Sequence, residues 1–319
     1  MNRFIIEFEK PIKELEEKIN ELERLSRDGD IGLEKDIVRL RKKSEKLREE
    51  IYSKLTRWQK VQLARHPQRP FTLDYITRIV AGFNELHGDR NFRDDASIVA
   101  GLGYWNGIKT AIIGHQKGRG TRDNLLRNFG MPHPEGYRKA LRVMGLAEKF
   151  NLPVITLIDT PGAYPGLGAE ERGQASAIAK NLMAMAQLKT SIVAVIIGEG
   201  GSGGALALGV ADRVLMMEYA IYSVISPEGC ASILYRDASL ASQAAEALKL
   251  TARDLIENRL VDMIIDEPVG GAHNDPDAAA KAVSEAVTRT LSEFSQMDPE
   301  ARIQKRIEKF KNMGIWQEG

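Results

Sequence analysis

Cysteine is almost absent from this chain of 319 residues, in which Cys230 is the only one. A single cysteine excludes an internal disulfide and any cysteine-cluster metal site, and it fits a reducing compartment. No histidine stands beside Cys230 to activate it as a nucleophile, so we interpret it as a packed thiol. We therefore expect a cytoplasmic protein, or a protein of the plastid stroma if the source is a plant, although no transit peptide is seen.

Long hydrophobic runs and a strong charge of one sign are also missing. No apolar stretch approaches the ~20 residues of a membrane-spanning helix, and the N-terminus does not resemble a signal peptide. The net charge of +1 and the pI of about 7.8 favour neither a nucleic acid nor a membrane surface as partner. A content of 43% hydrophobic and 28% charged residues is typical of a globular protein with an ample core.

The first 60 residues differ from the rest of the chain. Apolar residues recur there every three or four positions in two blocks, which a break at 26–30 separates. The blocks are Ile12, Leu15, Ile19 and Leu22, and then Leu33, Ile37, Leu40, Leu47 and Ile51. This spacing predicts two amphipathic helices in an antiparallel hairpin, and the mixed charges between them indicate a solvated face. We expect this hairpin, residues 1–63, to serve packing and assembly.

The rest of the chain is organised around a glycine-rich corner. Residues 191–197 are apolar and β-branched, which predicts a buried strand, and five glycines follow within 198–204. We expect a helix to begin at about Gly203. Glycine leaves peptide N–H groups open to a ligand, and the first N–H groups of a helix lack intrahelical partners. The corner can therefore bind an anion or a developing oxyanion.

Two other enzyme motifs match the same corner. Its glycines spell G-x-G-x-x-G, and an acidic residue, Glu218, follows at the distance a dinucleotide site requires. They also spell the G-x-S-x-G elbow of serine hydrolases, for which Asp262 or Asp266 with His273 could complete a triad. The expected helix is short for a dinucleotide unit, and no spacing supports the triad. We interpret Ser202 as a small spacer.

The order of strand, glycine turn and helix occurs once before in the chain. An apolar run at 152–159 predicts a buried strand, the turn at 159–166 contains two glycines, and a helix is expected from Ala169 to Gln187. Two such turns on neighbouring strands can direct peptide N–H groups at one point. This is the usual way to build an oxyanion hole from backbone.

Upstream of both turns, a helix is expected from Thr72, as its cap, to about Phe83, and Asn106-Gly107 predicts a two-residue hairpin turn. The second strand of that hairpin leads into a basic loop at 116–122. The basic loop can bind phosphate or carboxylate groups, and a solvated loop without a ligand is an equal alternative.

Five segments carry a resemblance to a known family. They are GHQKG at 114–118, PEGYRKALR at 134–142, IDTPGAYPG at 158–166, GEGGSGG at 198–204 and SPEGCASIL at 226–234. Each motif is weak alone, but in this order they resemble the carboxyltransferase α subunit of the multi-subunit acetyl-CoA carboxylase of bacteria and plastids. The resemblance covers nearly the whole chain, including the N-terminal hairpin.

The resemblance implies an α/β fold of the crotonase-like (ClpP/crotonase) class, a superhelix of ββα units that follows the antiparallel helical hairpin. Residues 64–296 would form the carboxyltransferase domain and residues 297–319 a C-terminal helix. The implied activity transfers a carboxyl group from carboxybiotin, on a biotin carboxyl carrier protein, to acetyl-CoA. The product is malonyl-CoA, in the first committed step of fatty acid synthesis.

The resemblance also implies partners and cofactors. A carboxyltransferase β subunit would complete an α2β2 heterotetramer and would carry the zinc, so no metal is expected on this chain. The carrier protein would supply carboxybiotin, and biotin carboxylase would perform the ATP-dependent step. The sequence agrees, because it contains no biotin-attachment motif, no P-loop and no zinc cluster.

The expected site is mostly backbone. The N–H groups of Gly203 and Gly204, with Gly162 or Ala163 as companion, would stabilise the ureido oxygen of biotin as carboxybiotin releases its carboxyl group. Residues expected to contact the substrates are Lys117, Arg119, Arg122, Tyr164, Glu199, Gly200 and Gly201. No side-chain nucleophile is required.

Two other functions remain as alternatives. A stand-alone crotonase-type acyl-CoA hydratase or decarboxylase would need a catalytic carboxylate beside the oxyanion hole, and Glu199 is the candidate close to the corner. A non-enzymatic RNA-binding scaffold would depend on the basic segment from Lys117 to Arg127, and its binding would be sensitive to salt.

Overall fold

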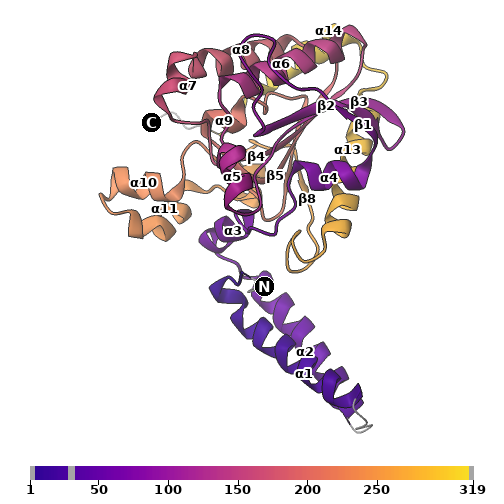
Figure 1. Cartoon of the computed structure of the whole chain (residues 1–319), viewed down its shortest axis with the longest axis vertical. Coiled ribbons are helices and arrows are strands. Elements are labelled where there is room, and N and C mark those ends of the chain that lie inside the picture. The colour runs from indigo at the N-terminus through magenta and orange to yellow at the C-terminus, as the bar shows by residue number, and fades with distance from the viewer. Residues whose placement is uncertain (1–3, 28–32, 316–319) are drawn as a thin grey trace.

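The computed structural model describes residues 4–27 and 33–315. Figure 1 shows an α/β body from which the N-terminal hairpin projects at one end. None of the described helices combines the length and the apolar character that a bilayer crossing requires.

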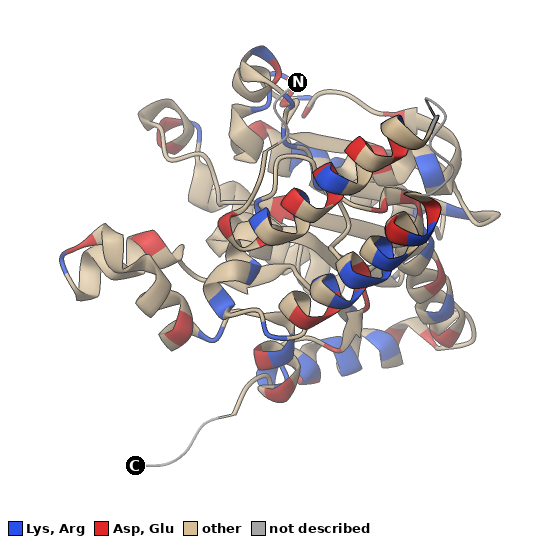
Figure 2. Ribbon diagram, turned by 90° about the horizontal axis from the view of Figure 1, so that it is seen from below, with Lys and Arg blue, Asp and Glu red and all other residues tan. Residues whose placement is uncertain are grey.

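The hairpin consists of α1 (Lys10–Arg27) and α2 (Glu34–Tyr52), after a short 3₁₀ turn at Glu7–Glu9. Residues of both predicted apolar stripes are buried along it, namely Ile12, Ile19 and Ile37, and the polar Ser44 is buried between them. The predicted hairpin is confirmed, although most of its predicted break at 26–30 lies outside the described residues. Basic and acidic side chains are interleaved along the helices in Figure 2 and do not gather by sign.

Within the described residues, eight strands form one sheet in the order β1-β2-β3-β4-β5-β6-β8, and β7 pairs with the end of β5. The pairs β1–β2 and β2–β3 are antiparallel, and the strands from β3 onward are parallel. The strands are β1 (Val80–Glu85), β2 (Ile98–Trp105), β3 (Ile108–His115), β4 (Val154–Thr160), β5 (Ile192–Gly201), β6 (Arg213–Met217), β7 (Ile221–Ser223) and β8 (Met263–Ile265).

The remaining helices cover the sheet. In Figure 1, α6, α8 and α14 lie together above it, and α10 packs on α11 in a lobe that projects from the body. The α-helices are α3 (Arg57–Ala64), α4 (Thr72–Ile79), α5 (Thr121–Leu126), α6 (Pro134–Lys149), α7 (Leu167–Glu171), α8 (Gln174–Gln187), α9 (Ser202–Leu206), α10 (Pro227–Leu234), α11 (Ala241–Leu248), α12 (Ala252–Glu257), α13 (Pro276–Phe294) and α14 (Pro299–Lys311), with 3₁₀ turns at Asn128–Gly130 and Ala238–Leu240.

The centre of the sheet is β4 and β5. Every residue of β4 is buried, and in β5 only Gly201 is partly exposed. Such continuous apolar strands are expected where helices cover both faces of a parallel sheet. Because β4 and β5 are adjacent and parallel, the two glycine turns at their carboxyl ends lie at the same edge.

Two predicted helices are wrong in extent. The helix expected at 72–83 ends at Ile79, and its last third is the edge strand β1, which pairs with β2 and contains Gly82 at φ +59°. Thr72 is not the cap of this helix. Phe71 holds that position, its N–H donates to Asp74, and the Thr72 hydroxyl donates to the carbonyl of His115.

The helix expected from Ala169 to Gln187 is two helices, α7 and α8, because Gly173 between them adopts φ +82°. The corner is also shifted, since β5 continues to Gly201 and α9 begins at Ser202, one residue before the predicted start. The hairpin turn at Asn106-Gly107 is confirmed, with positive φ angles at both residues.

The last helix, α14, is tied to the body by a buried cation. The Arg306 guanidinium is inaccessible to solvent and pairs with Asp212 at 2.7 Å. It also donates to the carbonyl oxygens of Leu188 and Thr190. These contacts join the C-terminal segment to the loop between the end of α8 and the start of β5.

Candidate functional site

The two glycine turns are in direct contact. A Cβ atom built on Gly204 would lie 2.6 Å from the backbone nitrogen of Ala163 and from the carbonyl carbon of Gly162. A Cβ on Gly201 would lie 2.2 Å from the carbonyl oxygen of Pro161. No real side chain tolerates such distances, so glycine at 201 and 204 is what lets the turns meet. We call the contact of residues 161–163 with residues 201–204 the double turn.

The double turn offers a small set of peptide N–H groups. The N–H of Gly162 donates to the hydroxyl of Thr160 at 3.1 Å, whereas within the described part of the chain the N–H of Ala163 has no protein acceptor. Gly203 and Gly204 belong to the first turn of α9, where N–H groups have no partner within the helix. Of the two companions expected from the first turn, Ala163 is therefore the one with a free donor.

The double turn does not provide the other two chemistries that its motifs allowed. The helix after the corner, α9, has five residues, which is too short for a dinucleotide unit. For the elbow, Ser202 is exposed at φ +51°. The triad candidates make contacts elsewhere: Asp262 pairs with Lys309, and the His273 ring stacks on the ring of His66.

Lys117 and Glu199 meet at the base of the double turn. The Lys117 ammonium lies 2.7 Å from Asp159 and 3.4 Å from Glu199. On its other side Glu199 pairs with Arg65 at 2.7 Å, and Arg65 pairs with Glu228 at 2.6 Å. We call these five side chains the ion network. The sequence indicated Lys117 and Glu199, but it gave no sign of Asp159, Arg65 or Glu228, because these contacts join distant segments.

The ion network keeps Glu199 ionised. Burial alone would raise the pKa of Glu199, but the charges of Lys117 and Arg65 outweigh it and hold the pKa below its usual range. A carboxylate in this state accepts hydrogen bonds and is a poor proton donor or base at neutral pH. The geometry therefore argues against Glu199 as the catalytic carboxylate of a stand-alone hydratase or decarboxylase.

Gly200 and Gly201 were also expected to contact the substrates. Gly200 is within β5, where it pairs with Thr160 and Tyr222, and Gly201 packs on Pro161. These two glycines shape the corner and offer no side chain to a substrate.

Arg119 and Arg122 line an open hollow at the start of α5 and are exposed. The Arg119 guanidinium pairs with Asp74 at 2.8 Å and lies 4.7 Å above the centre of the Phe71 ring. No ion pair involves Arg122 within the described residues, so it is the more available cation of the basic loop.

Tyr164 is fixed by the segment before α6. Its ring stacks on that of His133 at 4.1 Å, and its N–H donates to the carbonyl of Pro132 at 3.0 Å. Gln174 donates to the carbonyls of both Pro132 and Tyr164. The first glycine turn is therefore bound to the start of α6.

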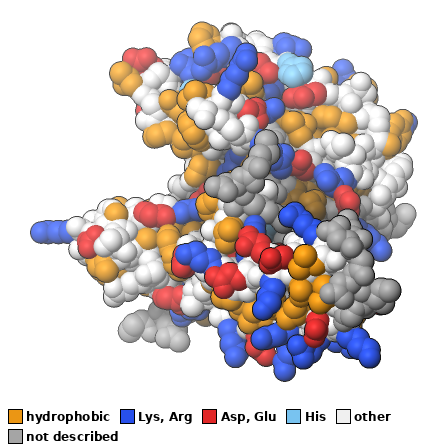
Figure 3. Space-filling model, turned by 60° about the horizontal axis from the view of Figure 1, so that its bottom comes forward, with side chains coloured by type: hydrophobic (Ala, Val, Ile, Leu, Met, Phe, Trp, Pro, Cys, Tyr) orange, Lys and Arg blue, Asp and Glu red, His pale blue; other side chains and the backbone are white. Residues whose placement is uncertain are grey.

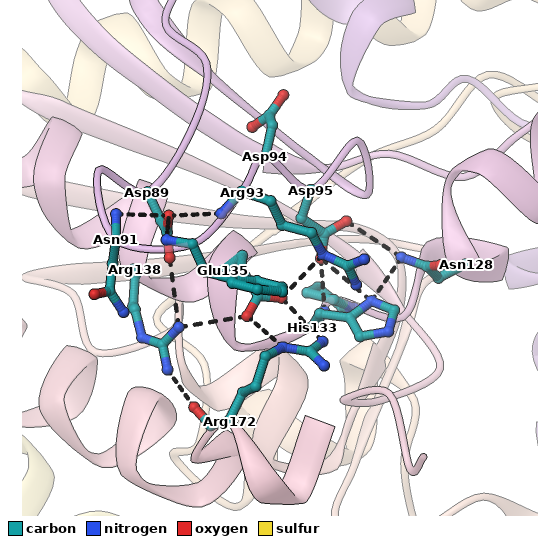
Figure 4. A network of polar contacts seen from close by, with 12 residues as sticks. Asp89, Asn91, Arg93, Asp94, Asp95, Asn128, His133, Glu135, Arg138 and Arg172 are labelled. Atoms are coloured by element: carbon teal, nitrogen blue, oxygen red, sulfur yellow. Dashed lines mark hydrogen bonds and ion pairs between the residues drawn. The ribbon is translucent and has the colours of Figure 1, made fainter. Parts of the chain in front are cut away.

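Figure 4 shows the charged cluster that holds this start in place. Glu135 has no solvent exposure and lies 2.8 Å from Arg172 and 3.4 Å from Arg138. Burial would raise the pKa of Glu135, but Arg172 in particular holds it below the usual range. From the sequence, the PEGYRKALR segment was only one of the motifs that carry the family resemblance. Its role in fixing the turn depends on Arg172, between α7 and α8.

A buried histidine lies behind the corner. His115, at the end of β3, is inaccessible to solvent, and neither of its ring nitrogens has a hydrogen-bond partner within the described residues. Burial lowers its pKa to about 3, against a smaller opposing effect of the backbone of Gly204. His115 is therefore neutral at physiological pH and packs against the double turn.

A cluster of two histidines and a glutamate joins the hairpin to the body. Potential ligand atoms of Glu9, His66 and His273 lie within 4.8 Å of one another, an arrangement that can bind a metal. The two imidazole rings, however, are stacked 3.9 Å apart, and Nδ1 of His66 already accepts the N–H of Gln68. Ligands of one zinc ion spread around it in a tetrahedron, so we interpret this cluster as a packed joint.

Comparisons with known proteins identify the family. A family model described as acetyl co-enzyme A carboxylase carboxyltransferase-like matches residues 5–314. The chain is 55% identical to the acetyl-coenzyme A carboxylase carboxyl transferase subunit alpha of Thioalkalivibrio sulfidiphilus, and all of both chains is covered. The chain belongs to this family. The corresponding subunit of Geobacter metallireducens is 56% identical, with 99% of each chain covered.

The family establishes the activity class. The chain is a transferase, a carboxyltransferase subunit of acetyl-CoA carboxylase, as its motifs predicted, and fatty acid synthesis is the corresponding pathway. The alternative of a stand-alone hydratase or decarboxylase is not the activity of this family.

Solved structures confirm the crotonase-like fold. A Pseudomonas malonate decarboxylase hetero-tetramer in complex with coenzyme A has a TM-score of 0.59 at 15% identity, over 74% of this chain and 91% of that one. Transcarboxylase 12S, with methylmalonyl-coenzyme A bound, has a TM-score of 0.53 at 22% identity, over 67% and 41%. At these identities the likeness concerns the fold alone.

Proposed function

We propose that the double turn is the oxyanion hole for carboxybiotin in the transfer of a carboxyl group to acetyl-CoA. The observation that carries this proposal is the contact of Gly204 with Gly162 and Ala163, which brings the backbones of the two glycine turns together. Two donors from different strands that point at one position are the arrangement that stabilises a developing negative oxygen.

The chemistry follows from this placement. As the N–C bond of carboxybiotin breaks, carbon dioxide leaves and the electron pair moves onto the ureido group, whose oxygen becomes negative. Ala163, Gly203 and Gly204 would donate to that oxygen. The ureido nitrogen then takes a proton from the methyl group of acetyl-CoA, and the resulting enolate attacks carbon dioxide to form malonyl-CoA. No side chain of this chain gains or loses a proton in these steps.

The proposal includes partners that supply what this chain lacks. Carboxybiotin would arrive on a carrier protein charged by biotin carboxylase, and a zinc-bearing β subunit would hold most of the CoA. The resulting assembly would be an α2β2 heterotetramer with each active site at an α–β contact. Arg122 and Arg119, exposed on the basic loop, are available to an anionic group of a substrate.

An exposed apolar surface supports a partner beside the double turn. The lobe of α10 and α11 projects from the body, with a hollow next to it in Figure 3. Large hydrophobic residues on and before α10 are exposed, namely Val224, Ile233 and Leu234. Exposed apolar groups on a projecting element are typical of a protein interface.

The proposal is tested by adding a methyl group at Gly204, the glycine through which the two turns make contact. Gly204→Ala should reduce carboxyl transfer by about 100-fold or more, because the added Cβ separates the donors and one lost donor costs about 3 kcal/mol. Gly145→Ala is the matched control, because a Cβ at that position in α6 meets no atom within 4 Å. Both variants are assayed for malonyl-CoA after mixing with the β subunit and carboxylated carrier.

Gly204→Ala could also disturb the fold, so a second variant keeps the test decisive. A Cβ on Gly203 would have only an ordinary contact, 3.8 Å from Ile178, and the residue is partly exposed. Gly203→Val should therefore fold and assemble but lose transfer. An assembled Gly203→Val or Gly204→Ala enzyme with normal turnover would refute the oxyanion hole.

A further inference from the structure

The ion network has a geometry that a substrate-binding cluster would not need. Lys117 follows β3, and its ammonium reaches one carboxylate from β4, Asp159, and one from β5, Glu199. These are the two strands that carry the glycine turns. A single cation, whose side chain is only 15% exposed, therefore bridges the bases of both halves of the double turn.

The carboxylate of Asp159 is itself placed between the strands. It is almost fully buried and accepts the N–H of Glu199 at 2.9 Å. A Cβ on Gly198 would lie 2.6 Å from it, so glycine there makes the room that the carboxylate occupies. Gly162 of the first turn lies three residues after Asp159, and Gly203 of the second turn lies four residues after Glu199.

The stem of Lys117 is also held. A Cβ on Gly130 would lie 2.6 Å from its Cγ, so glycine at 130 leaves space for the stem. The carbonyl of Gly130 in turn lies 2.7 Å from the hydroxyl of Thr160, which accepts the N–H of Gly162. The lysine stem thus packs on Gly130, whose carbonyl is hydrogen-bonded to Thr160 at the start of the first turn.

The ion network has no unpaired positive charge with which to bind an anionic ligand. Its two cations, Lys117 and Arg65, face three carboxylates, Asp159, Glu199 and Glu228. Burial would lower the pKa of Lys117, but Asp159 and Glu199 outweigh it and raise the pKa above its usual value. A permanently charged lysine that two carboxylates already neutralise is a poor attractor for an anionic substrate.

We propose that Lys117 is a positioning residue, which fixes the spacing of the double turn by holding Asp159 and Glu199 together, and that it does not bind a substrate anion. This proposal builds on the oxyanion hole proposed above and revises the substrate-binding role expected for Lys117. Without its ammonium, two buried carboxylates face each other, and the strands that carry the donors separate.

The expected effect is on turnover. Lys117→Met keeps the length of the side chain and removes the charge. The value of kcat should fall about 100-fold, because small displacements of catalytic groups have effects of this size, while KM for acetyl-CoA and for the carboxylated carrier stays within about twofold. Lys109→Met is the matched control, since Lys109 is an exposed lysine of the same strand, β3.

A second substitution separates the two roles. Glu199→Gln in the Lys117→Met background restores the charge balance, and the amide can donate to Asp159. If Lys117 only positions the double turn, the double variant should recover at least tenfold of the lost kcat. If Lys117 binds a substrate anion, the double variant cannot recover, because no cation returns.

Hydrogen exchange measured by mass spectrometry provides a readout that does not depend on activity. In the full chain, Lys117→Met should speed the exchange of peptides that span 159–166 and 198–206, and the double variant should slow it again. Unchanged exchange in Lys117→Met, or a change confined to KM, would overturn the proposal. If both Gly203→Val and Gly204→Ala prove active while the exchange and its rescue behave as expected, the oxyanion hole fails and the spacing role of Lys117 stands.

Discussion

Arg69 and Glu267 form a two-point ion pair with no solvent exposure on either side chain, at 2.9 Å and 2.5 Å. Arg69 also donates to the carbonyl of Ile197 at 2.7 Å, and Glu267 accepts the N–H groups of Tyr219 and Ala272. The pair therefore fastens the segment after α3 to the strand that leads into the double turn.

Arg69→Met should lower the free energy of unfolding by about 3–5 kcal/mol, because it leaves a buried carboxylate without its partner. Urea denaturation followed by circular dichroism measures the change. The double variant with Glu267→Met should lose less than the single variant, since no buried charge remains. An equal loss in both would mean that packing, and not charge pairing, accounts for the effect.

Acid should destabilise the fold through two buried histidines. The pKa of His115 is lowered to about 3 and that of His66 to about 4, both mainly by burial. The unfolded chain, with histidine pKa values near 6.5, binds more protons in this range. The free energy of unfolding should therefore fall as the pH drops from about 6.5 towards 4 and below.

His115→Leu tests the larger of these shifts. Its ring nitrogens have no partner within the described residues, so an apolar side chain should be tolerated at neutral pH and should flatten the acid dependence. A profile that His115→Leu does not alter would assign the acid sensitivity to other groups.

Ser202 should be dispensable for catalysis. Ser202→Ala and Ser202→Gly should both retain most of the carboxyl transfer, because the proposed chemistry uses no hydroxyl. Since Ser202 has φ +51°, the glycine variant should be more stable, by up to about 1 kcal/mol. Labelling of Ser202 by a fluorophosphonate, lost in Ser202→Ala, would instead identify a serine nucleophile.

Removal of the hairpin should affect assembly more than the fold of the body. The deletion should end at residue 54, because α3 belongs to the body through ion pairs of Arg57 with Asp254 and Glu246. It uncovers Leu63 and Tyr219, which pack with hairpin residues. Light scattering after mixing with the β subunit should show smaller complexes, while the far-ultraviolet circular dichroism loses only the hairpin's helical signal. Complexes that keep their full set of subunits would contradict this.

Local patterns were sufficient to predict most of the fold. The strands β4 and β5 follow from apolar runs, and the turns after them follow from glycines at 162 and 198–204. The edge strand β1 could not be predicted, because 80–85 is only partly buried and its pairing partner lies in β2. The split between α7 and α8 depends on one glycine, Gly173, whose positive φ the helical pattern around it does not reveal.

The candidate site was harder to predict than the fold. That Gly204 touches Ala163 follows from the parallel register of two strands, which glycine spacing suggested. The ion network depends instead on contacts such as Arg65 with Glu199, which join residues 134 positions apart in the sequence. Charged residues at that separation give no periodic signal, so the sequence could not connect Arg65 with Glu199 or Lys117 with Asp159.

The burial of Arg306 has a consequence for the synthesis of the chain. Asp212, just before β6, accepts two hydrogen bonds from the guanidinium of Arg306 in α14. During translation, that carboxylate emerges from the ribosome long before its counter-charge does. We therefore expect the sheet around the starts of β5 and β6 to reach its full stability only after α14 is released. A message cut short before codon 306 should yield a product with an uncompensated charge at its core, which marks it for proteolysis.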